Sequence, residues 1–244
     1  MSDFQQTISL IKSNLNVVKT RVADAASRSG RTIESVKIVT VTKKKSLEFL
    51  LAAYECGVRD FGENYAEEGL EKIIALKDLQ DIRWHMIGHI QSRKAKIVAK
   101  HFDFVHSVDS IKIADLLNRA SEEVGKELPI LFEVNISGEE SKSGFPAWER
   151  DQWPDIVMTI NIIKGFQQLI PQGLMTMPPL FSDPEMTRIY YQRLTALRGY
   201  LMSKLPDMNW QELSMGTSSD YQVAIEEGAT IVRIGEAIVG PRRY

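Results

Sequence analysis

The stretch that decides the fold is Val36-Lys37-Ile38-Val39-Thr40-Val41-Thr42, followed at once by Lys43-Lys44-Lys45. Its first seven residues are mostly apolar or β-branched, which predicts a buried strand that ends in a lysine run. A helix is predicted on each side of this strand. The preceding helix has apolar residues at steps of three and four until Gly30 stops it, and the following helix runs from Ser46 to Gly57.

The same alternation of strand and helix continues along the chain. The predicted strands after the first are Val58–Phe61, Arg83–Ile87, Phe102–Val108, Ile130–Asn135, Gln172–Met177, Gln211–Met215 and Thr230–Ile234. About eight strands separated by helices predict an α/β fold, a single (β/α)8 TIM barrel with an N-terminal helix. A doubly wound open sheet is the alternative, but no GxGxxG turn follows the first strand. No linker marks a boundary, so residues 1–244 are expected to form one domain.

The composition is that of an ordinary soluble globular protein, with 43% hydrophobic and 25% charged residues. A net charge of −2 and a pI of about 6.1 give no reason to expect nucleic acid or an anionic membrane as a partner. Cys56 is the only cysteine, which excludes an intramolecular disulfide and a multi-cysteine metal site. The N-terminus lacks the features of a signal peptide, and no segment has the roughly 20 apolar residues that cross a bilayer. We therefore expect a cytoplasmic protein.

Two predicted loops contain groups that bind phosphate in barrels of this kind, the loops after the seventh and eighth strands. The first contains Gly216, Thr217 and Ser218 immediately before a helix, and the second begins with Gly235. The free N–H groups of a helix N-terminus attract anions, and glycine lets the backbone approach a ligand closely. The alternative is that the polar side chains of residues 218–220 only cap the helix.

The lysine run stands at the carboxyl end of the first strand, where barrels of this class have their active site. Most such runs are simply solvated. Strand alternation would put Lys43 and Lys45 on one side, opposite Lys44. A lysine among apolar walls and near other cations has a lowered pKa and attacks aldehydes. The spacing does not decide between Lys43 and Lys45.

Two further polar residues interrupt predicted strands or follow them. Arg233 lies in an otherwise apolar strand, so it must be paired, either with a carboxylate inside the barrel or with a ligand. Asn64 follows the second strand and either binds a ligand or caps the next helix.

The histidines give no sign of a metal site. His85 and His89 are four residues apart on a strand rather than a helix, so they are not expected to converge on a metal. His101 and His106 have no evident partner, and ordinary packing or surface roles are expected for them.

Eight segments along the chain form a recognisable series. They are, in order, Val41-Thr42-Lys43, Phe61-Gly62-Glu63-Asn64-Tyr65, Trp84-His85-Met86-Ile87-Gly88, His106-Ser107-Val108-Asp109-Ser110, Lys142-Ser143-Gly144-Phe145, Gly173-Leu174-Met175-Thr176-Met177, Ser214-Met215-Gly216 with Ser218 and Asp220, and Val232-Arg233-Ile234-Gly235. Each segment is weak by itself, but their common order is specific. Through them the sequence resembles, over almost its whole length, the pyridoxal phosphate homeostasis protein family, whose fold is similar to the barrel domain of alanine racemase, fold type III of the pyridoxal phosphate proteins.

The resemblance implies a cofactor, pyridoxal 5′-phosphate (PLP), held as a Schiff base on Lys43. It further implies that Thr217, Ser218 and Gly235 hold the phosphate, that Arg233 faces the pyridine nitrogen, and that Asn64 lies beside the cofactor. The sequence departs from the family pattern in small ways: Thr42 replaces a serine, Ser46 a frequent proline, and His89-Ile90 a proline-leucine pair. None of these changes removes an implied contact.

The function implied by the resemblance is intracellular PLP homeostasis, in which the protein stores the cofactor and delivers it to PLP-dependent apo-enzymes, with indirect effects on amino-acid and keto-acid balance. A PLP-dependent amino-acid racemase of low activity is the alternative. A cationic Arg233 would disfavour a protonated ring nitrogen and weaken the cofactor as an electron sink. The chain continues for only about ten residues after the last strand, so we expect no second domain to supply a second base, no robust catalysis, and a monomer.

A third hypothesis is a Schiff-base aldolase without a cofactor. It is disfavoured because a phosphate corner beside a strand-one lysine suits a bound aldehyde cofactor at least as well.

Overall fold

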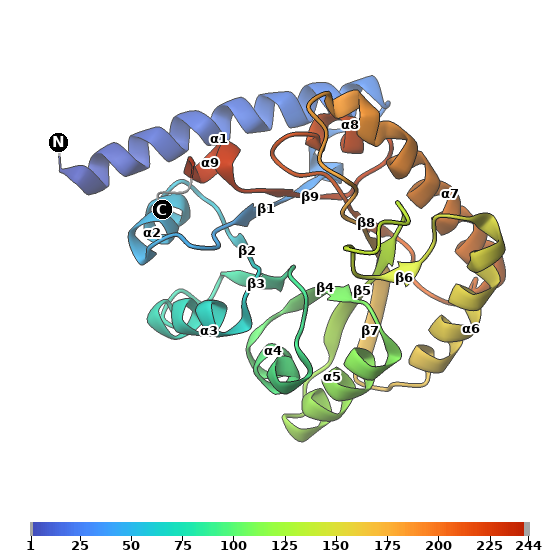
Figure 1. Cartoon of the computed structure of the whole chain (residues 1–244). Helices are drawn as coiled ribbons and strands as arrows, with labels where there is room; N and C mark the ends of the chain where they lie inside the picture. Colours follow the sequence, from blue (N-terminus) through green and yellow to red (C-terminus); the bar gives the residue numbers. More distant parts are fainter. Residues whose placement is uncertain (1, 242–244) are drawn as a thin grey trace.

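The computed structural model describes residues 2–241, and its centre is a closed parallel barrel (Figure 1). The strands are β1 (Lys37–Val41), β2 (Asp60–Glu63), β3 (Arg83–Met86), β4 (Phe104–Val108), β5 (Leu128–Asn135), β6 (Phe145–Pro146), β7 (Leu169–Met175), β8 (Glu212–Ser214) and β9 (Ile231–Ile234). The sheet order is β4-β3-β2-β1-β9-β8-β7-β5, and pairing of β4 with β5 closes the ring. The prediction of a (β/α)8 barrel is confirmed.

The strands differ from the prediction in several bounds and in one additional strand. β4, like β2, begins two residues late, whereas β5 begins two residues early and β7 three residues early. β2 begins at Asp60, two residues late, because the N–H of Val58 instead donates to the Ala53 carbonyl at 3.0 Å and closes the end of the preceding helix around Gly57. β6 was not predicted, since it has only two residues, which pair with the end of β5 and are too short to show a period.

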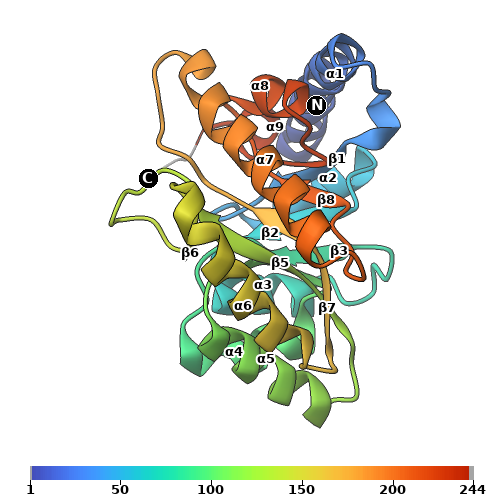
Figure 2. The same ribbon diagram turned by 90° about the vertical axis from the view of Figure 1, so that its right-hand side faces the viewer.

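Helices surround the barrel on its outer side (Figures 1 and 2). They are α1 (Asp3–Arg28), α2 (Leu47–Glu55), α3 (Ala66–Ala75), α4 (Ala95–His101), α5 (Ile111–Glu123), α6 (Trp153–Lys164), α7 (Arg188–Lys204), α8 (Tyr221–Glu226) and α9 (Glu236–Val239). The long α1 lies across α2, α8 and α9, buries the stripe Ile11, Leu15, Val18 and Val22, and donates from Asn14 Nδ2 to the Ile238 carbonyl at 3.0 Å. No helix in the described part of the chain is long and apolar enough to cross a membrane.

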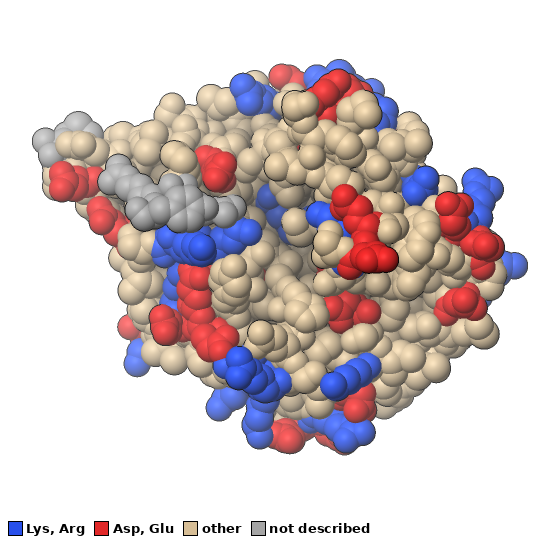
Figure 3. Space-filling model, in the orientation of Figure 1, with Lys and Arg blue, Asp and Glu red and all other residues tan. Residues whose placement is uncertain are grey.

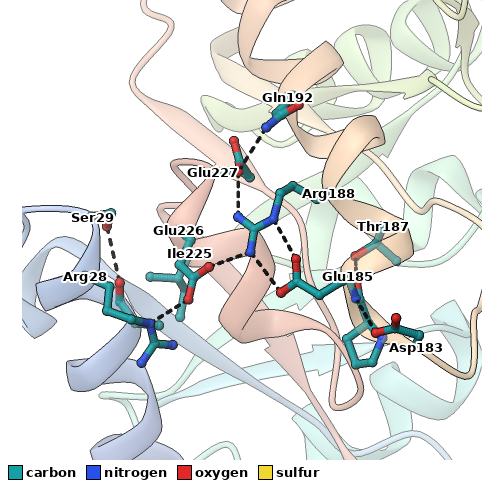
Figure 4. A network of polar contacts seen from close by, with 12 residues as sticks. Arg28, Ser29, Asp183, Glu185, Thr187, Arg188, Gln192, Ile225, Glu226 and Glu227 are labelled. Carbon is teal, nitrogen blue, oxygen red and sulfur yellow. Dashed lines mark hydrogen bonds and ion pairs between the residues drawn. The ribbon is translucent and has the colours of Figure 1, made fainter.

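A surface network fixes α8 from both sides (Figure 4). Arg188 of α7 contacts Glu185, Glu226 and Glu227 at 2.7–2.8 Å, and Arg28 of α1 contacts Glu226 at 2.7 Å. We call these five residues the α8 clamp. Because α8 directly follows the loop at residues 216–220, the clamp also fixes the position of that loop.

The barrel interior contains its own small apolar cluster, separate from the main core between strands and helices. Its members come from five strands and are Val39, Phe104, Leu131, Met175 and Ile231. Strand alternation places the next inward-facing positions toward the carboxyl ends of the strands. Those positions include Glu133, Ser214 and Arg233, so the interior changes from apolar to polar towards the mouth of the barrel.

Candidate functional site

The lysine run forms a tight turn at the mouth of the barrel. The N–H of Lys45 donates to the Thr42 carbonyl at 3.0 Å, and Lys44 has a φ of 60°, which makes it the one non-glycine residue of residues 2–241 with a positive φ. Glycine normally takes this place in a turn. A left-handed residue costs about 1–2 kcal/mol, so contacts around it must enforce the conformation.

Those contacts come from a buried ion-pair cluster below the turn. Lys72 Nζ lies 2.7 Å from the Thr42 carbonyl, from Glu63 Oε1 and from Glu68 Oε1. Glu68 Oε1 also accepts from the Lys44 N–H at 2.5 Å. We call Glu63, Glu68 and Lys72 the turn-anchoring cluster. Burial raises the pKa of Glu63, although the charge of Lys72 opposes the shift.

The turn separates the two lysines that the sequence left as alternatives. Lys45 Nζ donates to the Pro241 carbonyl at 2.8 Å and lies 4.7 Å from the centre of the Phe49 ring. Its amine is therefore directed to the C-terminal segment. Lys43 is half-buried at the mouth of the barrel, next to Thr42, whose hydroxyl points outward and donates to Glu63 at 2.6 Å.

Asn64 lies where the second strand opens into the mouth. Its Oδ1 is buried and has no hydrogen-bond partner among residues 2–241. The capping alternative is wrong, because α3 begins at Ala66 with Tyr65 as its N-cap. A Cβ on Gly88 would lie 2.3 Å from the Asn64 carbonyl, so the two loops pack backbone against backbone and hold Asn64 in place. A buried amide oxygen without a partner indicates a place for a ligand donor.

The two loops predicted to hold phosphate meet at Ser218. Its Oγ accepts from the N–H groups of Gly235 at 3.1 Å and Ala237 at 3.4 Å, so Ser218 joins the loops rather than capping α8. Asp220 accepts from the Thr217 N–H at 2.7 Å and from the Thr217 hydroxyl at 3.0 Å. Hydroxyls and backbone N–H groups converge at this corner, as an anion requires.

Arg233 is buried, with 3% of its surface exposed. It donates from Nη1 to Ser214 Oγ at 2.6 Å and from Nη2 to the Thr176 carbonyl at 2.9 Å. No carboxylate of the described residues touches it, so the predicted alternative of an ion pair inside the barrel is wrong. Burial lowers the pKa of Arg233, but a guanidinium remains cationic in proteins.

The sequence showed no partner for His106, and the structure gives it two. It is fully buried, its Nε2 lies 3.0 Å from Nδ1 of His85, and its Nδ1 lies 2.9 Å from Ser214 Oγ. His85 is buried as well and contacts Asp60, whereas His89 is exposed and contacts Asp109 at 2.8 Å. Sequence analysis missed these contacts because they join strands that are far apart in the sequence.

Glu133 is a further residue that sequence analysis missed. It lies on β5 with 8% of its surface exposed, and its Oε2 has no hydrogen-bond partner among the described residues. Burial and the charge of Asp109 raise the pKa of Glu133 to about 7, against the opposing charge of Arg233. An acidic residue between Phe132 and Val134 in an apolar strand was the available signal.

The mouth thus combines an amine, an anion corner and a buried guanidinium. Figure 3 shows the face hollowed at its centre, with basic side chains inside the hollow. A groove of about 420 Å³ beside Asn64 extends along Gly88 and His89. A lysine that attacks carbonyl carbon, next to donors for an anion, suits a small anionic carbonyl compound.

Comparison with known proteins defines the class. The family model described as alanine racemase, N-terminal domain, matches residues 11–243. The barrel also superposes on alanine racemase from Streptomyces coelicolor A3(2) with a TM-score of 0.72 at 14% identity, covering 95% of this chain and 58% of that one. At this identity the likeness shows the fold alone.

The curated relatives narrow the class. The pyridoxal phosphate homeostasis protein of Vibrio alginolyticus is 39% identical over 240 residues, 97% of this chain and all of the relative. That of Escherichia coli K12 is 36% identical over 237 residues, 96% and 97% of the two chains. PipY of Synechococcus elongatus PCC7942, solved with PLP bound, superposes with a TM-score of 0.79 at 32% identity, over 90% of this chain and all of PipY. The chain therefore belongs to the pyridoxal phosphate homeostasis protein family.

Proposed function

We propose that this protein binds PLP as a Schiff base on Lys43 and takes part in PLP homeostasis by storing the cofactor and delivering it to apo-enzymes. The observation that carries the proposal is the meeting, in one barrel mouth, of the Lys43 turn and the Ser218–Gly235 junction. PLP has an aldehyde for the amine and a phosphate for the junction. The cytoplasm, a monomer and a single domain are part of the same proposal.

The residues present fit this group. Lys43 would bind the aldehyde carbon, while Thr217, Ser218 and the N–H of Gly235 would bind the phosphate. The unpartnered Oδ1 of Asn64 is suited to accept a hydrogen bond from a group at the ring edge. Arg233 would lie against the pyridine nitrogen. PLP supplies an electron sink for amino-acid chemistry when its ring nitrogen is protonated.

The environment of Arg233 supports storage rather than rapid turnover. A carboxylate at the ring nitrogen would stabilise its protonated form, whereas Arg233 is a cation that presents only donors. Its two protein acceptors, Ser214 Oγ and the Thr176 carbonyl, carry no charge. The chain therefore favours a neutral ring nitrogen, which is a poor electron sink.

Absorption spectroscopy tests the binding site. We expect a visible band when PLP is added to the wild type, its loss in Lys43→Ala, and its retention in the matched variant Lys45→Ala, whose lysine is directed to Pro241. A band that survives in Lys43→Ala but disappears in Lys45→Ala would assign the cofactor to the other lysine.

Two activity measurements separate storage from catalysis. Loaded protein should raise the activity of a PLP-dependent apo-enzyme above a control with the same amount of free PLP. In D₂O, α-proton exchange of L-amino acids should stay far below ordinary enzyme rates, on the order of 1–10³ per second. Exchange at such rates would establish the racemase alternative instead.

A further inference from the structure

A line of buried polar groups runs through the barrel from one face to the other. Asp60 Oδ1 lies 3.0 Å from Nε2 of His85, and His85 Nδ1 lies 3.0 Å from Nε2 of His106. His106 Nδ1 lies 2.9 Å from Ser214 Oγ, which accepts from Arg233 Nη1 at 2.6 Å. His85, His106, Ser214 and Arg233 are at most 3% exposed. We call these five residues the interior chain.

The Asp60 end of the interior chain sets the direction of the hydrogen bonds. The Asp60 carboxylate accepts, so His85 donates to it from Nε2. Burial lowers the pKa of both histidines and keeps them neutral, so His85 Nδ1 accepts from His106 Nε2–H, and His106 Nδ1 accepts from the Ser214 hydroxyl. The Ser214 oxygen accepts from Arg233, which can only donate. Both histidines then have the same Nε2–H tautomer.

The charges around the interior chain agree with this assignment. Burial raises the pKa of Asp60, but the hydrogen bond from His85 and the charges of Arg83 and Lys37 oppose it, and the pKa lies below its ordinary value, so Asp60 is ionised. Burial lowers the pKa of His85 and, more strongly, of His106. A protonated His106 would have no lone pair to accept from the Ser214 hydroxyl, so that hydrogen bond of the interior chain would be lost.

The interior chain is not suited to move protons to or from the mouth of the barrel. Its inner end is a guanidinium, which does not give up its proton in proteins. We therefore expect it to fix the orientation of its members, because His85, His106 and Ser214 each have one donor and one acceptor in use.

We propose that Asp60, His85, His106 and Ser214 are positioning residues for Arg233, because they leave the Ser214 oxygen no role except to accept from the guanidinium. Arg233 is thereby held in one orientation at the floor of the mouth. This inference rests on the proposed function in one respect: the group that Arg233 would face is the PLP ring.

Nuclear magnetic resonance of ¹⁵N-labelled protein without PLP tests the direction of the chain. We expect His85 and His106 to be neutral Nε2–H tautomers from pH 6 to 8, and Arg233 to show separate Nη–H signals because its guanidinium does not rotate freely. A protonated histidine, or an Nδ1–H tautomer at either position, would overturn the inference. This measurement is independent of whether Lys43 binds PLP.

Two amide variants test the link to Arg233. In His106→Asn the amide oxygen lies near the position of Nδ1 and still accepts from Ser214. In His106→Gln the amide instead reaches the position of Nε2 and leaves Ser214 without its acceptor. We expect His106→Gln to merge the Arg233 Nη–H signals, to weaken PLP binding about tenfold and to shift the PLP absorption band. His106→Asn keeps the acceptor for Ser214 but loses the contact with His85, so it should be impaired clearly less than His106→Gln.

The controls make each outcome decisive. His101→Gln, at the half-buried end of α4, should change none of these signals. If Asn and Gln at position 106 are equally impaired, the role is packing and the inference is wrong; if both match the wild type, it is also wrong. If the wild type shows no Lys43-dependent band, the proposed function fails, while the Arg233 signals still decide the inference.

Discussion

Two ion-pair networks with similar contact distances hold this barrel, and they differ in their access to water. In the turn-anchoring cluster, Lys72 lies 2.7 Å from Glu63 and Glu68; the Lys72 and Glu63 side chains are 6% and 0% exposed, and that of Glu68 is 25% exposed. In the α8 clamp, Arg188 lies 2.7–2.8 Å from three glutamates, but its side chain is 29% exposed and that of Glu185 59%. Equal contact distances therefore do not imply equal contributions to the free energy of unfolding.

The reason is the solvation of the charge that remains when its partner is removed. An exposed charge that loses its partner is solvated by water, so a surface pair contributes about 0–1 kcal/mol. A buried charge that loses its partner stays without solvation, which costs about 3–5 kcal/mol. The turn-anchoring cluster also holds the strained turn at Lys44, whereas the clamp holds a helix that already packs on the core.

The largest effect is expected for Lys72→Met. The change leaves the buried carboxylate of Glu63 without a cation, and we expect a loss of about 3–5 kcal/mol in the free energy of unfolding, measured by denaturant titration. The double variant Glu63→Met with Lys72→Met should recover much of the loss, because neither of these two buried charges is then left without its partner. If the double variant is less stable than Lys72→Met alone, the contrast between the two networks is not one of solvation.

The second prediction extends the contrast to a buried acid, Glu133, whose Oε2 has no hydrogen-bond partner among the described residues. The pKa of Glu133 is raised to about 7 in the folded state from an ordinary 4.5. Between these values the folded protein holds a proton that the unfolded chain releases, so stability falls as pH rises and the full penalty is present above pH 7. Glu133→Gln cannot ionise and lacks this penalty.

We therefore expect Glu133→Gln to be more stable than the wild type at pH 8, by up to about 3 kcal/mol, and about equal to it at pH 4.5. The measurement is denaturant unfolding of PLP-free protein across this pH range. Parallel stability profiles for the two proteins would show that Glu133 is ionised in the fold at an ordinary pKa.

The smallest effect is expected for Arg188→Met in the α8 clamp. The variant loses three partly exposed ion pairs, and we expect its free energy of unfolding to fall by only about 1 kcal/mol. The difference from the wild type should shrink further in 0.5 M salt, because salt screens exposed charges. A loss as large as that of Lys72→Met, unchanged by salt, would remove the distinction between the networks.

The fold was predictable because its signal is local. Each strand shows its own short β-branched run and each helix its own period, so the order of elements follows without knowledge of contacts. The start of β2 was misplaced because Val58 looks like a strand residue and is buried, yet its N–H closes the end of α2. Patterns of side chains do not show where a backbone N–H donates.

The site was predictable only in part. Lys43, Ser218 and Arg233 follow or lie in β1, β8 and β9, which are successive neighbours in the barrel. The contact that distinguishes Lys45 from Lys43 is made with the Pro241 carbonyl, nearly 200 residues further along, so the sequence could not show it. The partners of His106 and the burial of Lys72 depend on which strands and helices become neighbours, and no local pattern contains that information.

The interior chain contains a buried proton whose hydrogen exchange can be measured at the centre of the barrel. The Nε2–H proton of His106 lies between the side chains of His106 and His85, which are 0% and 1% exposed, so we expect it to exchange with solvent deuterium only when the barrel itself opens. Backbone amides near a surface report the fraying of single elements, whereas a proton this deep reports cooperative opening. Its exchange rate would therefore measure how often the barrel opens.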